Sequence, residues 1–72
     1  MGYRFSRHAR NRLRALGISR KEVELLVAST HPVDRDLEGR PRHEGEVDGV
    51  PVRVVVAVDR PDLIVTVYGR SR

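Results

Sequence analysis

The sequence predicts an α+β fold in which helices precede a sheet, and two observations carry that prediction. The first is a pair of capped segments within residues 5–29, whose apolar side chains recur at helical spacing. The second is a change to a spacing of two from Val33 onward, interrupted by turn signals at Gly39-Arg40-Pro41, Asp48-Gly49 and Asp59-Arg60-Pro61-Asp62. We therefore expect a single domain over residues 1–72, with two N-terminal helices packed on one face of a four-stranded antiparallel meander.

The first helix is expected from about Arg7 to Leu16. Ser6 is a suitable N-cap and Gly17 a suitable C-terminal glycine. Residues Tyr3 to Phe5 form an extended lead-in, which can add a fifth strand to the sheet. Helical spacing places three apolar side chains on one buried stripe, namely Ala9, Leu13 and Leu16.

The second helix is expected from about Arg20 to Ser29. Ser19 and Glu22 have the spacing of a capping box, and Pro32 prevents a helix from continuing beyond Thr30. The short link between the helices predicts a helix hairpin. The side chains expected to face inward are Val23, Leu26 and Val27.

The turns also allow the strand register to be predicted, over strands of about 42–47, 50–58 and 63–70. The turn at Asp48-Gly49 places Glu44 opposite Arg53, and the next turn places Arg53 opposite Tyr68 and Val56 opposite Val65. His43 falls on the core face. Both registers put one apolar set on the face that carries the helices: Val50, Val52, Val54, Val56, Val58, Leu63, Val65 and Val67.

Composition narrows the class of protein. The 72-residue chain has no cysteine, which excludes disulfides and thiolate metal sites. No apolar run approaches the roughly 20 residues of a membrane span, and the N-terminus lacks the apolar region of a signal peptide. The histidines lack the spacing of metal ligands, so we expect no metal and no cofactor. A cytoplasmic protein with no membrane partner is therefore expected.

Positive charge is concentrated in the helical half of the chain. Residues 1–30 carry seven basic and two acidic side chains, whereas residues 31–72 carry seven basic and eight acidic ones. Arginine, which accounts for nearly all of the excess, can contact phosphate in a bidentate manner and stack on bases. We expect phosphate contacts from the first helix and from two sheet positions: Arg7, Arg10, Arg12, Arg14, Arg42 and Arg70. The alternative for the helix is a solvated basic surface.

The open face of the sheet carries a polar row of three residues that forms a candidate catalytic site. Arg53 could bind a scissile phosphate, Tyr68 could stack or donate a hydrogen bond, and Glu44 could orient Arg53 or take a proton. The alternative is a solvated sheet face with a cross-strand ion pair. His8 is a further acid–base candidate, although a positioning role near Tyr3 also fits a lone histidine. An apolar patch on the same face, available to a protein partner, is expected from Val55, Ala57 and Ile64.

Several segments resemble a small bacterial family of uncharacterised domains that is grouped with the RelE/ParE and BrnT toxins. The resemblance lies in residues 5–9, Arg12, 17–19 and Val23, and in the later segments 43–45, 49–55 and 66–68. It implies a compact helix–helix–sheet fold and a possible ribonuclease toxin activity. No lysine follows Lys21, so a lysine-based part of the RelE site is missing. The resemblance marks His8, Arg12, Arg53 and Tyr68, with Arg70 near the end of the last strand.

The sequence thus favours a toxin-like RNA-binding or RNA-cleaving domain of a toxin–antitoxin type system. A 2′-hydroxyl of RNA can serve as the nucleophile, so phosphate stabilisation can carry the rate without a metal. The expected partners are RNA, which can be ribosome-associated, and an antitoxin or a second copy of the chain. Two alternatives stay open: a non-catalytic module that binds a protein through the open sheet face, and a DNA-binding accessory protein.

Overall fold

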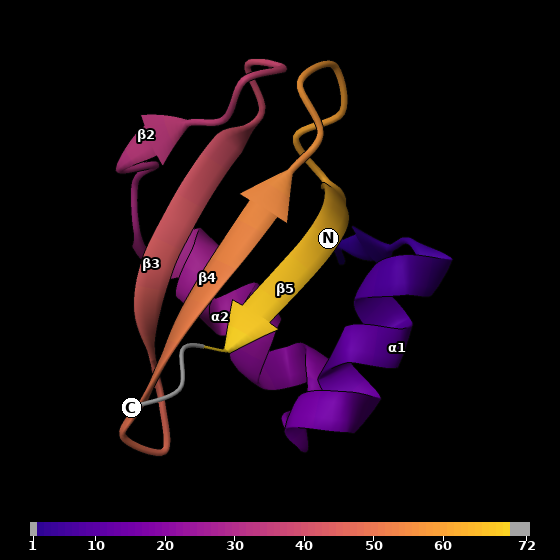
Figure 1. Cartoon of the computed structure of the whole chain (residues 1–72), viewed down its shortest axis with the longest axis vertical. Coiled ribbons are helices and arrows are strands. Elements are labelled where there is room, and N and C mark those ends of the chain that lie inside the picture. The colour runs from indigo at the N-terminus through magenta and orange to yellow at the C-terminus, as the bar shows by residue number, and fades with distance from the viewer. Residues whose placement is uncertain (1, 70–72) are drawn as a thin grey trace.

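A computed structural model describes residues 2–69 of the chain. The two helices are separated from each other only by a short link and precede most of the sheet (Figure 1). In chain order the elements are β1 (Arg4–Phe5), α1 (Arg7–Leu16), α2 (Arg20–Ser29), β2 (Asp34–Arg35), β3 (Pro41–Val47), β4 (Val50–Val56) and β5 (Leu63–Gly69).

The sheet has five strands in the order β1-β5-β4-β3-β2 and is mixed. β1 pairs with β5 in parallel, and the other pairs are antiparallel. The expected four-stranded antiparallel meander is therefore corrected to a mixed sheet, in which the lead-in supplies an edge strand. β2 is shorter than the alternation from Val33 predicted, because the Asp36 carboxylate accepts the backbone N–H groups of Glu38 and Arg40 and turns the chain.

The helix caps are as predicted. The Ser6 hydroxyl accepts the Ala9 N–H at 3.0 Å, and Gly17 ends α1 with a left-handed φ of 72°. Ser19 and Glu22 form the capping box of α2. The helices cover one face of the sheet, α1 mainly over β5 and α2 mainly over β3, rather than forming a hairpin whose main packing is between the helices (Figure 1).

Gly45 allows α2 to lie close to β3. A Cβ atom at this position would lie 2.8 Å from Cδ1 and 2.9 Å from Cγ of Leu26. Such distances are shorter than van der Waals contact, so the side chain of Leu26 occupies the space that a side chain at position 45 would need. The glycine is thus a packing requirement of the core.

The predicted register is confirmed between β3 and β4 and for the part of β4 and β5 far from the turn at residues 59–62, and it is wrong between a bulge and that turn. Glu44 lies opposite Arg53, and Arg53 lies opposite Tyr68, but a shift between Val55 and Val56 places Val56 opposite Ile64. The core therefore contains Ile64, which is fully buried, in the place expected for Val65. Further departures from the expected core are Val50 and Val58, which are exposed.

The bulge also determines how the outer edge of β5 is paired. Before it, the Ile64 carbonyl accepts the Ser6 N–H at 3.1 Å. After it, Val65 and Val67 direct their carbonyls outward, and α1 supplies the donors: the Ser6 hydroxyl at 2.6 Å to Val65 and the Arg12 Nε at 3.2 Å to Val67. Side chains from α1 therefore complete a sheet edge that β1 is too short to cover.

Candidate functional site

The predicted polar row is present on the sheet face that the helices leave open. Glu44 of β3, Arg53 of β4 and Tyr68 of β5 are direct neighbours across the strands. Arg53 forms an ion pair with Glu44 through its Nη2 atom. Tyr68 is 47% exposed, so its ring is accessible to a ligand. The row presents a guanidinium, a carboxylate and a phenol side by side.

Two buried polar atoms near the row have no hydrogen-bond partner within the described part of the chain. They are the Nε of Arg53 and the Oγ1 of Thr66. Thr66 lies opposite Val55, on the same face as Arg53. An unpaired buried donor or acceptor is costly, and both atoms lie beneath the surface, so a ligand could reach them only if neighbouring side chains moved.

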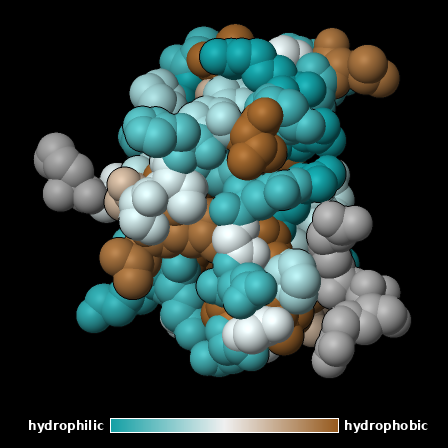
Figure 2. Space-filling view, turned by 90° about the vertical axis from the view of Figure 1, so that its left-hand side faces the viewer, coloured by the Kyte–Doolittle hydropathy of each residue, from teal (hydrophilic) through white to brown (hydrophobic). Residues whose placement is uncertain are grey.

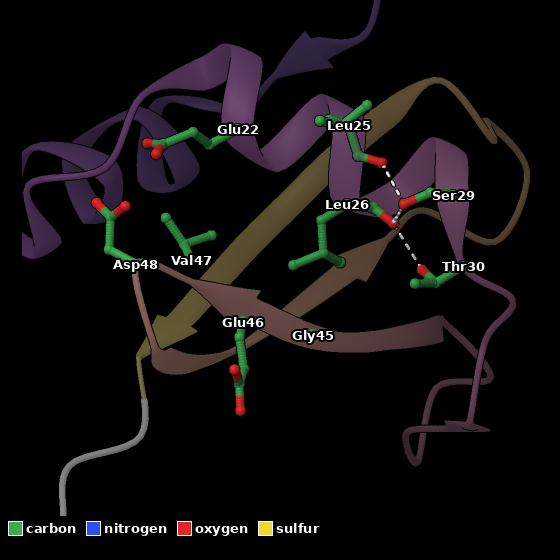
Figure 3. Close-up of a pocket in the computed structure, with 9 residues that line it drawn as sticks. All are labelled: Glu22, Leu25, Leu26, Ser29, Thr30, Gly45, Glu46, Val47 and Asp48. Carbon is green, nitrogen blue, oxygen red and sulfur yellow. Dashed lines mark hydrogen bonds between the residues drawn. The ribbon is translucent and has the colours of Figure 1, made fainter.

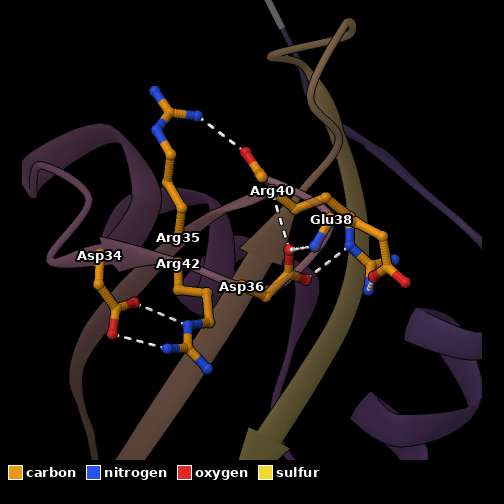
Figure 4. Close-up of polar contacts among 7 residues, drawn as sticks. Asp34, Arg35, Asp36, Glu38, Arg40 and Arg42 are labelled. Carbon is orange, nitrogen blue, oxygen red and sulfur yellow. Dashed lines mark hydrogen bonds and ion pairs between the residues drawn. The ribbon is translucent and has the colours of Figure 1, made fainter.

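The other arginines of this face are held in ion pairs at the β2–β3 corner (Figure 4). Arg42 contacts both carboxylate oxygens of Asp34, at 2.7 and 2.6 Å, and its hydrogen bond lowers the pKa of that carboxyl. Arg40 pairs with Asp36 and Glu38, each at 2.7 Å. The expected phosphate-binding role of Arg42 therefore competes with a bidentate carboxylate that already occupies its guanidinium.

The arginines of α1 are arranged differently. Arg7, Arg10 and Arg14 are exposed, and none of them forms an ion pair with a described residue. Arg12 is half-buried, and its Nε donates a hydrogen bond to the Val67 carbonyl at the edge of β5. This helix thus displays positive charge that the fold does not neutralise.

The structure does not join His8 to the polar row. His8 is exposed on α1, and no hydrogen bond or ion pair among residues 2–69 links it to Glu44, Arg53 or Tyr68. Arg70, the remaining predicted site residue, lies outside the described residues. His43 is buried on the core face, as predicted, and its Nδ1 lies 2.9 Å from the Thr30 hydroxyl.

The predicted apolar patch on the open face is corrected by the bulge. Ile64 is fully buried in the core beneath the helices, Val55 is also buried, and only Ala57 is partly exposed. The patch depended on an unbroken alternation in β5, which the bulge interrupts. The surface on the β2–β3 side of the molecule is largely hydrophilic, with a discontinuous hydrophobic strip (Figure 2).

A groove between α2 and β3 was not expected from the sequence (Figure 3). Leu25 and Leu26 form its apolar part, and Leu25 is exposed. Its rim carries the carboxylates of Glu22 and Asp48, whereas the Glu46 side chain points to the other side of β3, so the groove is acidic and unsuited to phosphate (Figure 3).

Sequence reasoning also missed a basic hollow beside α1. Its charged lining consists of Arg4 from β1, Arg10 from α1, Arg20 from α2 and Arg60 from the turn before β5. Only Arg10 belongs to the predicted set. The others are isolated in the sequence, and the parallel pairing of β1 with β5, which brings Arg4 to that turn, has no local signal.

Neither a cluster of metal ligands nor a membrane-spanning helix is present among the described residues. Residues 2–69 contain no group of three or more His, Asp or Glu side chains that could hold a metal ion. None of the helices described is long and apolar enough to cross a membrane.

Comparison with known proteins gives a family and no closer relative. No curated protein and no solved structure matches the chain. One family model matches residues 5–69, which span both helices and all the strands of the sheet except the first residue of β1. That extent includes the polar row and α1 with its arginines. The chain therefore belongs to the family of small domains described as a domain of unknown function, DUF4258.

Proposed function

We propose that this protein is an RNA-binding domain of the toxin type, related to RelE/ParE and BrnT toxins and acting in the cytoplasm. The observation that carries the proposal is the separation of its arginines. Arg40, Arg42 and Arg53, on or beside the open sheet face, are paired with carboxylates, and Arg35 of β2 donates to the Gly39 carbonyl. Arg7, Arg10 and Arg14 of α1 are exposed and have no such partner among the described residues. A polyanion would neutralise this surface.

The energetics of α1 favour a polyanionic partner over a merely soluble surface. The helix carries four arginines and one histidine, and it has no acidic side chain in its first turn. Like charges one turn apart destabilise a helix, and nothing within α1 offsets them. Phosphate groups along a strand can pair with several guanidiniums at once.

Single-stranded RNA fits the surface better than duplex DNA. Tyr68 is exposed beside Arg53 on the open sheet face and can stack on an unpaired base of a flexible strand that continues from α1. α2 does not serve as a helix that reads the major groove, because it packs on β3 and carries Glu22 and Glu24.

The salt dependence of RNA binding tests this proposal. Affinity for a single-stranded RNA oligonucleotide should fall steeply with salt, and the variant R7Q/R10Q/R14Q should reduce the slope of log K against log salt by about 2. Arg35→Gln, which removes an exposed charge from β2, should leave the slope nearly unchanged. Absence of binding at low salt, or equal slopes in both variants, would contradict the proposal.

RNA cleavage is a second candidate, favoured by the polar row, in which a carboxylate, a guanidinium and an exposed phenol are direct cross-strand neighbours. In this reaction the 2′-oxygen forms a bond to phosphorus while the bond to the 5′-oxygen breaks, which leaves a 2′,3′-cyclic phosphate. Glu44 would accept the 2′-hydroxyl proton, Tyr68 would donate one to the leaving oxygen, and Arg53 would stabilise the charge on the phosphoryl oxygens.

Arg53→Ala separates cleavage from binding alone. Loss of this donor should lower the cleavage rate by roughly 10²-fold or more. The free energy of unfolding should change by less than about 1 kcal/mol. His8→Ala should retain most of the rate, since His8 lies apart from the row. Wild-type protein that neither cleaves free or ribosome-bound RNA nor slows growth would exclude a catalytic toxin. The antitoxin or second copy expected as a partner would then need a surface other than Val55 and Ile64.

A further inference from the structure

We infer that the basic hollow lined by Arg4, Arg10, Arg20 and Arg60 binds a terminal phosphate monoester of RNA, a specificity that rests on the proposed RNA-binding function. The hollow has a volume of about 390 Å³. Its lining contains these four arginines, together with Tyr3, Phe5 and Leu63, and no acidic residue. Four separate elements therefore direct positive charge toward one concavity.

The backbone around each arginine is fixed by the fold. The Arg4 N–H donates to the Asp62 carbonyl at 2.7 Å, and the Arg60 carbonyl accepts the Leu63 N–H at 2.9 Å. Arg10 lies within α1, and Arg20 is the first residue of α2 after its capping box. The Arg20 guanidinium lies over the Phe5 ring, 5.1 Å from its centroid, which positions this side chain before a ligand arrives.

No described ion pair neutralises these four arginines. Glu24 is one turn from Arg20, and Asp59 and Asp62 share the turn of Arg60, but none of the three lines the hollow. The sheet face has a hollow of the same volume, lined by Arg35, Arg40 and Arg42, in which Asp36 and Glu38 supply the counter-charge. The hollow beside α1 therefore has positive charge that no lining carboxylate balances, and an anion would supply the counter-charge.

The charge of the hollow fits a terminal phosphate better than an internal one. A phosphate monoester carries between about 1.5 and 2 negative charges at neutral pH and has three free oxygens, as a phosphorylated side chain does. An internal phosphodiester carries one negative charge. Several guanidiniums around one concavity can each donate to a different oxygen of the monoester. The half-buried Tyr3 and Leu63 border the same space and can contact the adjoining nucleoside.

The test compares one RNA oligonucleotide with a 5′-phosphate, a 3′-phosphate or hydroxyls at both ends, as unlabelled competitors at fixed salt. We expect one of the terminal phosphates to raise affinity about tenfold, the equivalent of about 1.4 kcal/mol. Arg20→Gln and Arg60→Gln should each remove that preference. The matched controls Arg7→Gln and Arg14→Gln, outside the hollow, should weaken all three RNAs equally and keep the preference.

Each outcome bears on one of the two proposals. Equal affinity for the three RNAs, or a preference that survives in both Arg20→Gln and Arg60→Gln, would overturn the hollow as a terminal-phosphate site and leave RNA binding intact. A separate titration with adenosine 5′-monophosphate distinguishes a free nucleotide from an RNA end. Arginine-dependent binding of this nucleotide, without binding of any RNA, would support the phosphate chemistry of the hollow and contradict the proposed RNA-binding function.

Discussion

Gly45 and His43 are neighbours on the core face of β3, and each has a role that burial alone explains. Gly45 has no side chain because Leu26 occupies the space. The Thr30 hydroxyl donates its proton to the Leu26 carbonyl at 2.7 Å, so it must accept from the His43 Nδ1–H. The hydrogen bond thereby fixes the neutral tautomer of the buried imidazole.

Gly45→Ala should destabilise the protein by about 1–3 kcal/mol, because the added methyl group displaces Leu26 from the core. Urea unfolding measures the change, with Glu46→Ala on the exposed side of the strand as the control. When Leu26→Ala is already present, Gly45→Ala should cost less unfolding free energy, since the space for the added methyl group is then free. A neutral or stabilising Gly45→Ala would contradict the close packing of α2 on β3.

Stability should depend on pH through His43. Burial lowers the pKa of this imidazole below its ordinary 6.5, and the nearby charge of His31 lowers it further. The unfolded chain therefore binds a proton more readily, so the stabilisation is complete above pH 6.5 and is lost as pH falls through the folded-state pKa. The melting temperature should decline as the pH falls from about 6.5 toward the folded-state pKa, and His43→Leu should abolish the decline in this range. If the melting temperature of the variant still declined over the same pH range, titratable groups other than His43 would be responsible for the decline.

At the scale of elements, α1 combines two tasks on different sides. Ser6 and Arg12 complete the outer edge of β5, and Ala9 and Leu13 enter the core. Arg7, Arg10 and Arg14 remain in solvent. The helix is thus anchored by its polar and apolar contacts to the sheet, which permits the remaining face to carry charge for a ligand.

Ser6→Ala should cost about 1–2 kcal/mol, because it removes both the N-cap of α1 and the hydrogen bond to the Val65 carbonyl. Ser19→Ala loses the cap of α2 without exposing a strand edge and is the matched comparison. Thermal unfolding of the two variants gives the difference. A smaller loss of stability in Ser6→Ala than in Ser19→Ala would show that the hydrogen bond from Ser6 to the edge of β5 contributes nothing to stability.

For the whole molecule, the sheet carries the helices on one face (Figure 1). The polar row lies on the other face. Val54 and Val58 discriminate between the predicted end of β4 at Val58 and the observed end at Val56. Unbroken alternation would bury both, whereas Val54 is 0% and Val58 is 56% exposed.

Val54→Asp should unfold the protein, since a buried unpaired charge costs several kcal/mol against a small margin. Val58→Asp should change stability by less than about 0.5 kcal/mol. Circular dichroism and thermal unfolding of the two variants decide the matter. Unfolding of both variants would restore a strand that continues to Val58.

Local signals explain how much of this molecule its sequence predicts. The caps and the Asp48-Gly49 turn act over a few residues, so the helices and the pairing of Glu44 with Arg53 were predictable. The bulge was not, because valines on both sides of Val55 fit either face equally well. The basic hollow depends on elements distant in sequence, and pairing over such separations leaves no pattern within a short window.

The place of β5 in the sheet has a consequence for synthesis of the protein. This strand is synthesised after the other described elements, yet it lies between β1 and β4 and forms the surface on which α1 packs. While residues 63–69 are still in the ribosome, the newly made helices have no complete sheet to cover. Apolar side chains of α1 and β4 then remain available to chaperones or to aggregation. The fold, and with it the basic hollow, is completed only after residues 63–69 have left the ribosome.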